Sequence, residues 1–155
     1  MALVVPPRME ARLREYDSFH TQRGNELTHW AGIPLIIVGT ASLLSAVTLV
    51  SDGSLSLLPL VLTGITLFYL IEARVLGLVT ALAMGALAAL GRTLPAPIGL
   101  GLFAVGWLLQ LIGHAVYEKR SPAFLKNLTH LLVGPAWLVE RLLRRTASLS
   151  DPQRS

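Results

Sequence analysis

The sequence contains no cysteine, so disulfide bonds and thiolate metal sites are excluded. A bound metal would have to be held by imidazole, carboxylate or carbonyl groups. Charged residues are also scarce, because they make up 14% of the 155 residues, whereas soluble domains carry about 25%. Hydrophobic residues make up 53% of the chain, and the mean hydropathy is +0.61. This composition indicates a protein that is embedded in lipid.

The apolar residues are concentrated in long runs that contain no Asp, Glu, Lys or Arg. The first run has 20 residues, which at about 1.5 Å per residue matches a hydrocarbon core of about 30 Å. The third run is rich in alanine and glycine, which favours close packing between helices. The runs predict an all-α, integral membrane helical bundle with four transmembrane helices, at Ala31–Val50, Leu55–Ile71, Val75–Leu90 and Ile98–Val116.

Amphipathic segments flank these runs. Residues 8–22 place apolar side chains on one helical stripe, and we expect this helix to lie on the membrane surface. Segment Phe124–Leu143 separates apolar residues from positions 126, 127, 130, 137 and 141, which predicts a C-terminal interfacial helix rather than a fifth span. Residues 1–145 are predicted to form a single membrane-embedded domain, and the polar residues 146–155 a disordered tail. The N-terminal stripe consists of Met9, Leu13, Tyr16 and Phe19.

Positive charge is distributed unevenly over the predicted topology. Four spans place 12 of the 13 lysines and arginines on one side, with only Arg92 on the other. Since cytoplasmic loops are enriched in these residues, both termini are predicted to be cytoplasmic. Basic residues beside apolar runs are suited to anionic lipid headgroups. Membrane lipids rather than nucleic acid are therefore the predicted partners, despite the net charge of +4.

Four histidines are the strongest candidates for chemistry. His20 and His29 precede the first predicted span, His114 ends the fourth, and His130 follows it, so the topology places all four at the cytoplasmic interface. Imidazole binds Fe, Zn, Cu and Ni, and a cluster without thiolates is compatible with a redox iron. His20 and His29 would lie on opposite sides of one straight helix. A shared metal site therefore predicts a break in the helix at Gly24.

Polar residues near the histidines are candidates for supporting roles. His114 and Glu118 are four residues apart and share a helical face, so Glu118 is a candidate ligand, ligand-supporting group or proton acceptor. Asn25 and Gln110 are predicted to orient ligands or substrate. Alternatively, interfacial histidines turn their polar edge toward water, and Glu118, with the two basic residues after it, ends a span as a solvated stop.

Two stretches resemble a known family. Tyr16–Leu35 and Gly113–Glu140 are similar to segments of the 2-hydroxy fatty acid dioxygenase family. The first stretch resembles the family pattern of His, Asn and His before Gly-Ile-Pro. The second, with Gln110 just before it, resembles a Gln-x-x-Gly-His motif followed by Glu-Lys and Pro-Ala. The matching residues are His20, Asn25, His29, Gly32, Ile33, Pro34, Gln110, Gly113, His114, Glu118, Lys119, Pro122 and Ala123.

The resemblance implies an Fe(II)-dependent enzyme that uses O₂ to shorten a 2-hydroxy fatty acid by one carbon, releasing the carboxyl carbon. It implies His20, His29 and His114 as iron ligands, and we keep His130 as a fourth candidate. Residues 1–145 would then be a catalytic domain. The composition, rich in leucine and alanine, favours a bacterial inner-membrane protein. The oligomeric state is not predicted.

Charged and polar residues near the histidines complete the predicted site. Glu118 and Lys119 are the predicted catalytic residues. Arg120 and Lys126, with Asn25 and Gln110, are predicted to contact the substrate or to support the ligands, because a basic group at the interface would attract a carboxylate. Two other classes of function remain open: a non-catalytic haem-binding or lipid-binding membrane protein, and a zinc-dependent lipid hydrolase.

Overall fold

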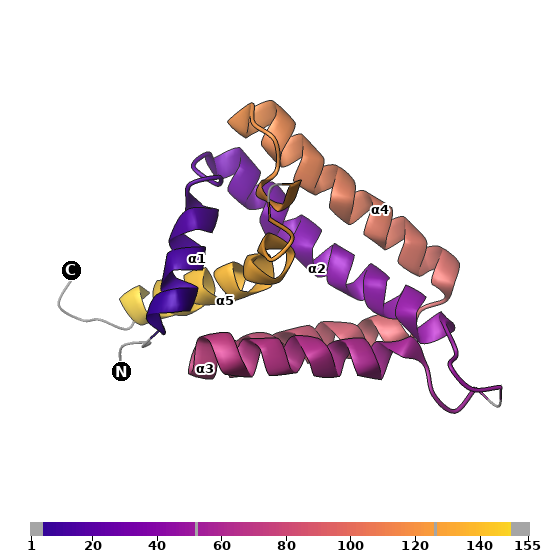
Figure 1. Ribbon diagram of the computed structural model, residues 1–155. Helices are drawn as coiled ribbons and strands as arrows, with labels where there is room; N and C mark the ends of the chain where they lie inside the picture. Colours follow the sequence, from indigo (N-terminus) through magenta and orange to yellow (C-terminus); the bar gives the residue numbers. More distant parts are fainter. Residues whose placement is uncertain (1–4, 52, 126, 150–155) are drawn as a thin grey trace.

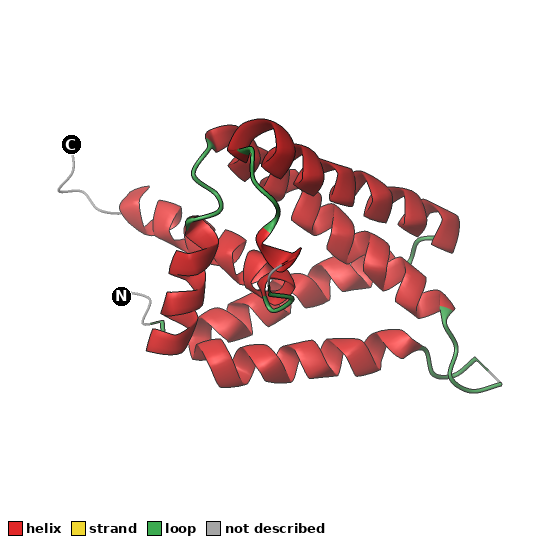
Figure 2. Ribbon diagram, turned by 45° about the horizontal axis from the view of Figure 1, so that its top comes forward, coloured by secondary structure: helices red, strands yellow, loops and turns green. Residues whose placement is uncertain are grey.

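The structure is a computed structural model that describes residues 5–51, 53–125 and 127–149. Every regular element in these ranges is helical, as the sequence predicts (Figure 2). An antiparallel bridge between Thr48 and Ser56 closes the loop after the second helix. The elements are α1 (Pro7–Asp17), α2 (Arg23–Ala46), α3 (Leu57–Arg92), α4 (Ala96–Ile112), the π-helical turn η1 (Gly113–Glu118), the 3₁₀ turn η2 (Ala123–Leu125) and α5 (His130–Leu149) (Figure 1).

Three helical segments are long and apolar enough to cross a membrane, namely α2, α3 and the continuous segment Ala96–Glu118. The second and third predicted spans are joined in α3, whose backbone leaves the helical region at Arg74 (φ 46°, ψ −114°). A β-carbon added at Gly77 would collide with the carbonyl oxygen of Tyr69, although eight residues of straight helix would separate them by about 12 Å. Helix α3 therefore folds back on itself, as Figure 1 shows.

Helix α2 lies between α4 and α3 and packs along both. Its approach to α4 depends on glycines spaced seven residues apart on each helix. A β-carbon at Gly39 would lie 2.6 Å from the carbonyl oxygen of Gly99, and one at Gly106 would lie 2.8 Å from that of Gly32. Contacts this close bring the two backbones together, which is the usual way for helices to associate in lipid.

The predicted N-terminal stripe is buried by protein. Met9, Leu13 and Tyr16 pack in one core cluster with Val133 and Trp137 of α5. The apolar stripe of α1 therefore faces α5 and the fold-back of α3 rather than lipid headgroups. This differs from the predicted surface helix, because a partner helix distant in the sequence covers the stripe.

Helix α5 buries residues from both predicted faces. His130 and Trp137 of the predicted polar face and Leu138 of the predicted apolar face are buried, whereas Leu131 and Leu142 are exposed. The polar groups find partners on α1, because the indole Nε1 of Trp137 donates to Asp17 at 2.5 Å. The helix also continues to Leu149, four residues into the predicted tail, and residues 150–155 lie outside the described residues.

Candidate metal centre

Three histidines from distant parts of the chain meet at one end of the α2–α4 pair. His20 lies in the loop after α1, His29 in the second turn of α2, and His114 in η1. One ring nitrogen from each lies within 4.8 Å of the others, and all three residues are buried. The break in the chain that allows this falls between α1 and α2, at residues 18–22, rather than at the predicted Gly24. Gly24 is helical, and the ring of Tyr117 occupies the space that its side chain would fill.

The hydrogen bonds of two rings fix their protonation. Nδ1 of His20 donates to the carbonyl of Tyr16 at 2.6 Å, and Nδ1 of His29 donates to the carbonyl of Asn25 at 2.9 Å. A carbonyl only accepts, so each neutral ring carries its proton on Nδ1 and a lone pair on Nε2. The two Nε2 atoms face each other at 3.0 Å. Two lone pairs cannot bond to each other, so a cation between them would satisfy both.

The three histidines fit a divalent metal ion. Two nitrogens that are each about 2.1 Å from one ion, at a right angle, would lie about 3.0 Å apart, which agrees with the 3.0 Å between His20 and His29. Metal-binding histidines commonly donate their other N–H to a backbone carbonyl, as both do here. Burial lowers the pKa of His20 to about 4, despite the opposing effect of the Tyr16 carbonyl. The ring is therefore neutral at pH 7, as a ligand must be.

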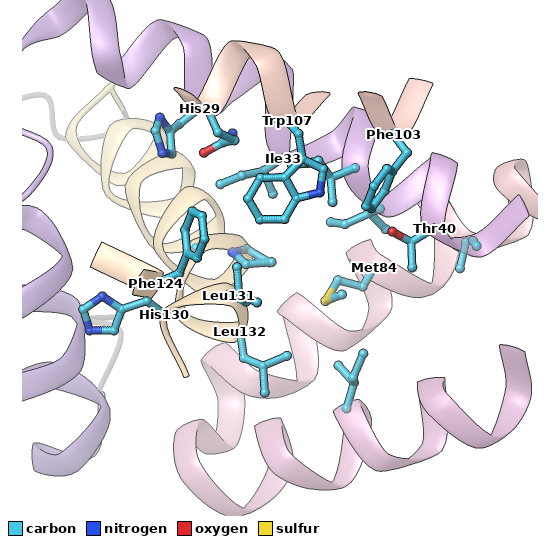
Figure 3. A pocket seen from close by; sticks show the side chains of 18 of the residues that line it. His29, Ile33, Thr40, Met84, Phe103, Trp107, Phe124, His130, Leu131 and Leu132 are labelled. Atoms are coloured by element: carbon cyan, nitrogen blue, oxygen red, sulfur yellow. The ribbon is translucent and has the colours of Figure 1, made fainter. Parts of the chain in front are cut away.

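The fourth predicted ligand, His130, does not belong to this group. Its ring is buried at the start of α5, with Nε2 3.4 Å from a carboxylate oxygen of Glu15. Its ring centroid lies 5.9 Å from that of Tyr16 and 6.0 Å from that of Phe19. Figure 3 shows His29 and His130 well apart. Of the four predicted ligands, the structure thus brings three together.

Glu118 ends the π-helical turn that carries His114, and its carboxylate reaches the loop that carries His20. It accepts hydrogen bonds from the Thr21 hydroxyl at 2.9 Å and from the Gln22 backbone N–H at 2.8 Å. Gln22 precedes the first residue of α2, so the carboxylate lies at the positive end of the helix dipole. Glu118 does not belong to the group of three histidines that could hold a metal ion. Its contacts hold two of the histidine-bearing segments together.

The other predicted polar residues fall into two groups. Asn25 is fully buried and donates to Glu118 at 3.3 Å, while its backbone carbonyl orients His29. Gln110 is buried beside His114, and its amide Nε2 has no hydrogen-bond partner among the described residues. Lys119, in the left-handed conformation that follows η1, and Arg120 are exposed. Lys126 lies outside the described residues.

Sequence reasoning missed two aromatic neighbours of the centre. The Tyr16 ring stacks on the His20 ring, with centroids 4.1 Å apart and planes 12° apart, and burial raises the pKa of its phenol. The Trp137 ring lies 5.3 Å from that of His20. Tyr16 is four residues before His20, a spacing that places two rings on one face when a helix extends between them. The position of Trp137 depends on how α5 packs, which no local spacing reveals.

A cavity of about 390 Å³ opens beside the three histidines. It extends between α2, α3, α4 and α5, and its walls are mainly aliphatic and aromatic side chains (Figure 3). Trp107 of α4 and Phe124 of η2 meet edge to face at one side, with ring centroids 5.0 Å apart. His130 and Gln110 also line the cavity. The three histidines, which could hold a metal ion, therefore lie beside a cavity that is suited to an apolar molecule.

The fold and site define an all-helical protein with helices of membrane-spanning length and a three-histidine centre beside an apolar cavity. The sequence profile of the family described as "2-hydroxy-palmitic acid dioxygenase Mpo1-like" matches residues 7–146, and the chain belongs to this Mpo1-like family. It is 33% identical over 127 residues to the protein named 2-hydroxy-palmitic acid dioxygenase MPO1 from Saccharomyces cerevisiae, covering 81% of this chain and 73% of the yeast protein. No solved structure matches the chain.

Proposed function

We propose that the protein is an Fe(II)-dependent dioxygenase that shortens 2-hydroxy fatty acids by one carbon at the membrane interface. The observation that carries this proposal is the direct connection between the three-histidine group and the apolar cavity. The balanced reaction converts R–CH(OH)–COOH and O₂ into R–COOH, CO₂ and H₂O. The bond between the carboxyl carbon and the hydroxyl-bearing carbon breaks, and O₂ takes up four electrons.

His20, His29 and His114 would hold the iron, which supplies the capacity to activate O₂. Three neutral nitrogen ligands leave positions for a 2-hydroxy acid and for O₂. The buried amide of Gln110 has an unused donor in the cavity wall, and we assign it to the hydroxyl or carboxylate oxygen of the substrate. Glu118 acts as a positioning residue through its contacts with Thr21 and Gln22.

We also propose a membrane arrangement, which rests on the hydrophobic runs and the distribution of positive charge. Each arm of α3, Leu57–Ala73 and Val75–Arg92, spans the bilayer, which gives four spans and places both termini in the cytoplasm. The histidines then lie at the cytoplasmic interface and the cavity lies within the hydrocarbon. The exposed Lys119 and Arg120 attract anionic fatty acids to that interface.

The spacing of the facing nitrogens argues against a bis-histidine haem. Axial haem ligands lie on opposite sides of the macrocycle, so their nitrogens are about two metal–nitrogen bonds, roughly 4 Å, apart. The Nε2 atoms of His20 and His29 are 3.0 Å apart, which leaves no room for a ring system between them. A zinc-dependent hydrolase is distinguished by its independence of oxygen.

The test is turnover by the full-length protein in detergent, loaded with Fe(II) and given 2-hydroxyhexadecanoic acid labelled with ¹³C in the carboxyl group. We expect pentadecanoic acid, labelled CO₂ and O₂ consumption in equal amounts. Zinc-loaded protein under air and iron-loaded protein without O₂ are the controls. Product formation in the absence of O₂ would contradict the proposal.

A further inference from the structure

The cavity beside the three histidines follows α2 along most of its length. Its lining on α2 begins at His29, continues through Ile33, Ile37 and Ala41, and ends at Leu44. Steps of three and four residues place these side chains on one face of the helix. Leu44 follows His29 by 15 positions, which correspond to about 22 Å at about 1.5 Å per residue. The cavity therefore extends about 22 Å along α2, with the histidines at one end.

A separate core cluster lines the far end of the cavity. Ala41 of α2 packs there with Leu58 and Ala88, which come from the two arms of α3. Leu44 and Leu62 pack against this cluster, and all five residues line the cavity. Ala88 is 1% exposed and lines the cavity, so a larger side chain at this position would add atoms to the wall. The end wall therefore consists of both small and large apolar side chains.

We propose that the extended alkyl chain of the substrate occupies this cavity, and that Ala88 and Leu44 at its far end set the preferred chain length. The proposal rests on the proposed function, which places the hydroxy acid end at the histidines. A staggered alkyl chain with bonds of about 1.5 Å advances about 1.25 Å per carbon. A path of about 22 Å therefore accommodates roughly 16 to 18 carbons.

Two substitutions change the end wall in opposite directions. Ala88→Leu extends a side chain into the cavity by about two carbon–carbon bonds, so the preferred substrate should become about two carbons shorter. Leu44→Ala removes part of the wall, so longer chains should be accepted. Burial of each methylene changes affinity by about fourfold. We therefore expect each variant to shift the kcat/KM ratio between the 16-carbon and 14-carbon or 18-carbon substrates by roughly tenfold.

Matched controls carry the same substitutions outside the cavity. Ala89→Leu changes the exposed neighbour of Ala88, and Leu60→Ala changes an exposed leucine on the first arm of α3. Neither residue lines the cavity. The controls should keep the wild-type chain-length profile. If Ala88→Leu fails to fold, Leu44→Ala tests the proposal alone, because it removes atoms rather than adding them.

The experiment measures turnover of saturated 2-hydroxy acids of 12 to 20 carbons by full-length protein. It also measures binding of the corresponding unhydroxylated fatty acids without turnover. Opposite shifts in the two variants, with unchanged controls, support the proposal. An unchanged profile in both variants, or equal shifts in the controls, overturns it. If wild-type protein binds with the expected length preference but turns over no hydroxy acid, the proposed reaction fails while the assignment of the cavity stands.

Discussion

Individual residues in the centre divide into those that would bind a metal and those that hold the binders in place. The Nδ1 atoms of His20 and His29 are both committed to backbone carbonyls, which directs both Nε2 atoms to the same point. The His114 ring completes the group, with its centroid 4.9 Å from that of His20 and 5.0 Å from that of His29. The His130 ring lies apart from this group, with its Nε2 3.4 Å from a carboxylate oxygen of Glu15. The two kinds of histidine should respond differently to mutation.

Replacing the histidines one at a time by alanine tests this division. His20→Ala, His29→Ala and His114→Ala should each lose bound iron and all dioxygenase activity, because each removes a ligand. His130→Ala should retain stoichiometric iron. The measurement is metal content after purification, with circular dichroism to check folding. Loss of iron in His130→Ala comparable to that in His114→Ala would show that His130 is a ligand.

The substitution Glu118→Gln tests whether Glu118 binds the metal itself or only holds the histidine-bearing segments in position. The amide keeps the size of the side chain but weakens its acceptance of the Gln22 and Thr21 donors. Mutation of a residue that orients a metal ligand typically lowers the metal affinity by about 10-fold to 100-fold. We therefore expect weaker iron binding that saturates at one equivalent, measured by titration with Fe(II). Complete loss of iron binding, even at high Fe(II) concentration, would identify Glu118 as a ligand. An unchanged affinity for iron would show that Glu118 has no role in the metal centre.

The sequence predicts the members of the centre better than their roles. Composition and topology were enough to place His20, His29 and His114 at one interface, and the structure brings them together. The separation of His130 depends on the position of Glu15 and on the path of residues 119–125 and 127–129, whose sequence has no strong periodicity. The role of Glu118 depends on the approach of residues 21 and 22, almost a hundred positions away.

At the scale of helices, the hydrophobic runs predict where the long helices lie in the sequence. The contacts between helices decide which face of each helix is buried. The four predicted runs correspond to α2, the two arms of α3, and α4. The sequence predicts a turn between the second and third runs, at residues 72–74, and the structure has its fold-back there, at Arg74. The burial of Trp137 on the predicted polar face of α5 depends on α1, which no pattern within α5 reveals. In the structure Arg141 of α5 pairs with Asp17 of α1 at 2.9 Å.

The α2–α4 contact gives a prediction with an internal control. Gly106→Ala places a methyl group near the Gly32 carbonyl and Ile36 of α2, whereas Gly101→Ala, on the same helix, meets open space. We expect Gly106→Ala to lower the free energy of unfolding by roughly 1–3 kcal/mol. Gly101→Ala should be neutral or stabilising, because alanine favours helix over glycine by about 1 kcal/mol. Thermal unfolding in detergent measures both, and equal effects would contradict the packing.

For the whole molecule, the proposed topology places the connecting loops on two sides of the membrane. The loop after α2 and the loop after η1 lie at opposite ends of the α2–α4 pair (Figure 1). The chain has no cysteine, so single introduced cysteines report position without background. Ser51 and Ser121 are both exposed. They are suitable sites for labelling from outside the cell.

In intact bacterial cells, a membrane-impermeant maleimide should label Ser51→Cys and leave Ser121→Cys unmodified. After lysis, both should be labelled, because both positions are exposed in the folded protein. The expected result follows from placing the histidine-bearing end in the cytoplasm. The readout is a mass shift of the modified protein. The reverse pattern would invert the orientation, and labelling of both in intact cells would contradict the predicted spans.

The centre takes its nitrogens from residues 20, 29 and 114, so the last donor emerges from the ribosome long after the first two. Iron bound there would cross-link residue 20 to the fourth hydrophobic stretch and close a loop of more than ninety residues. Such a cross-link restricts the unfolded chain, and its contribution to the stability of the fold increases with the length of the loop. Biosynthesis would then end with metallation, and a nascent chain that stops before residue 114 would have two donors and no complete site.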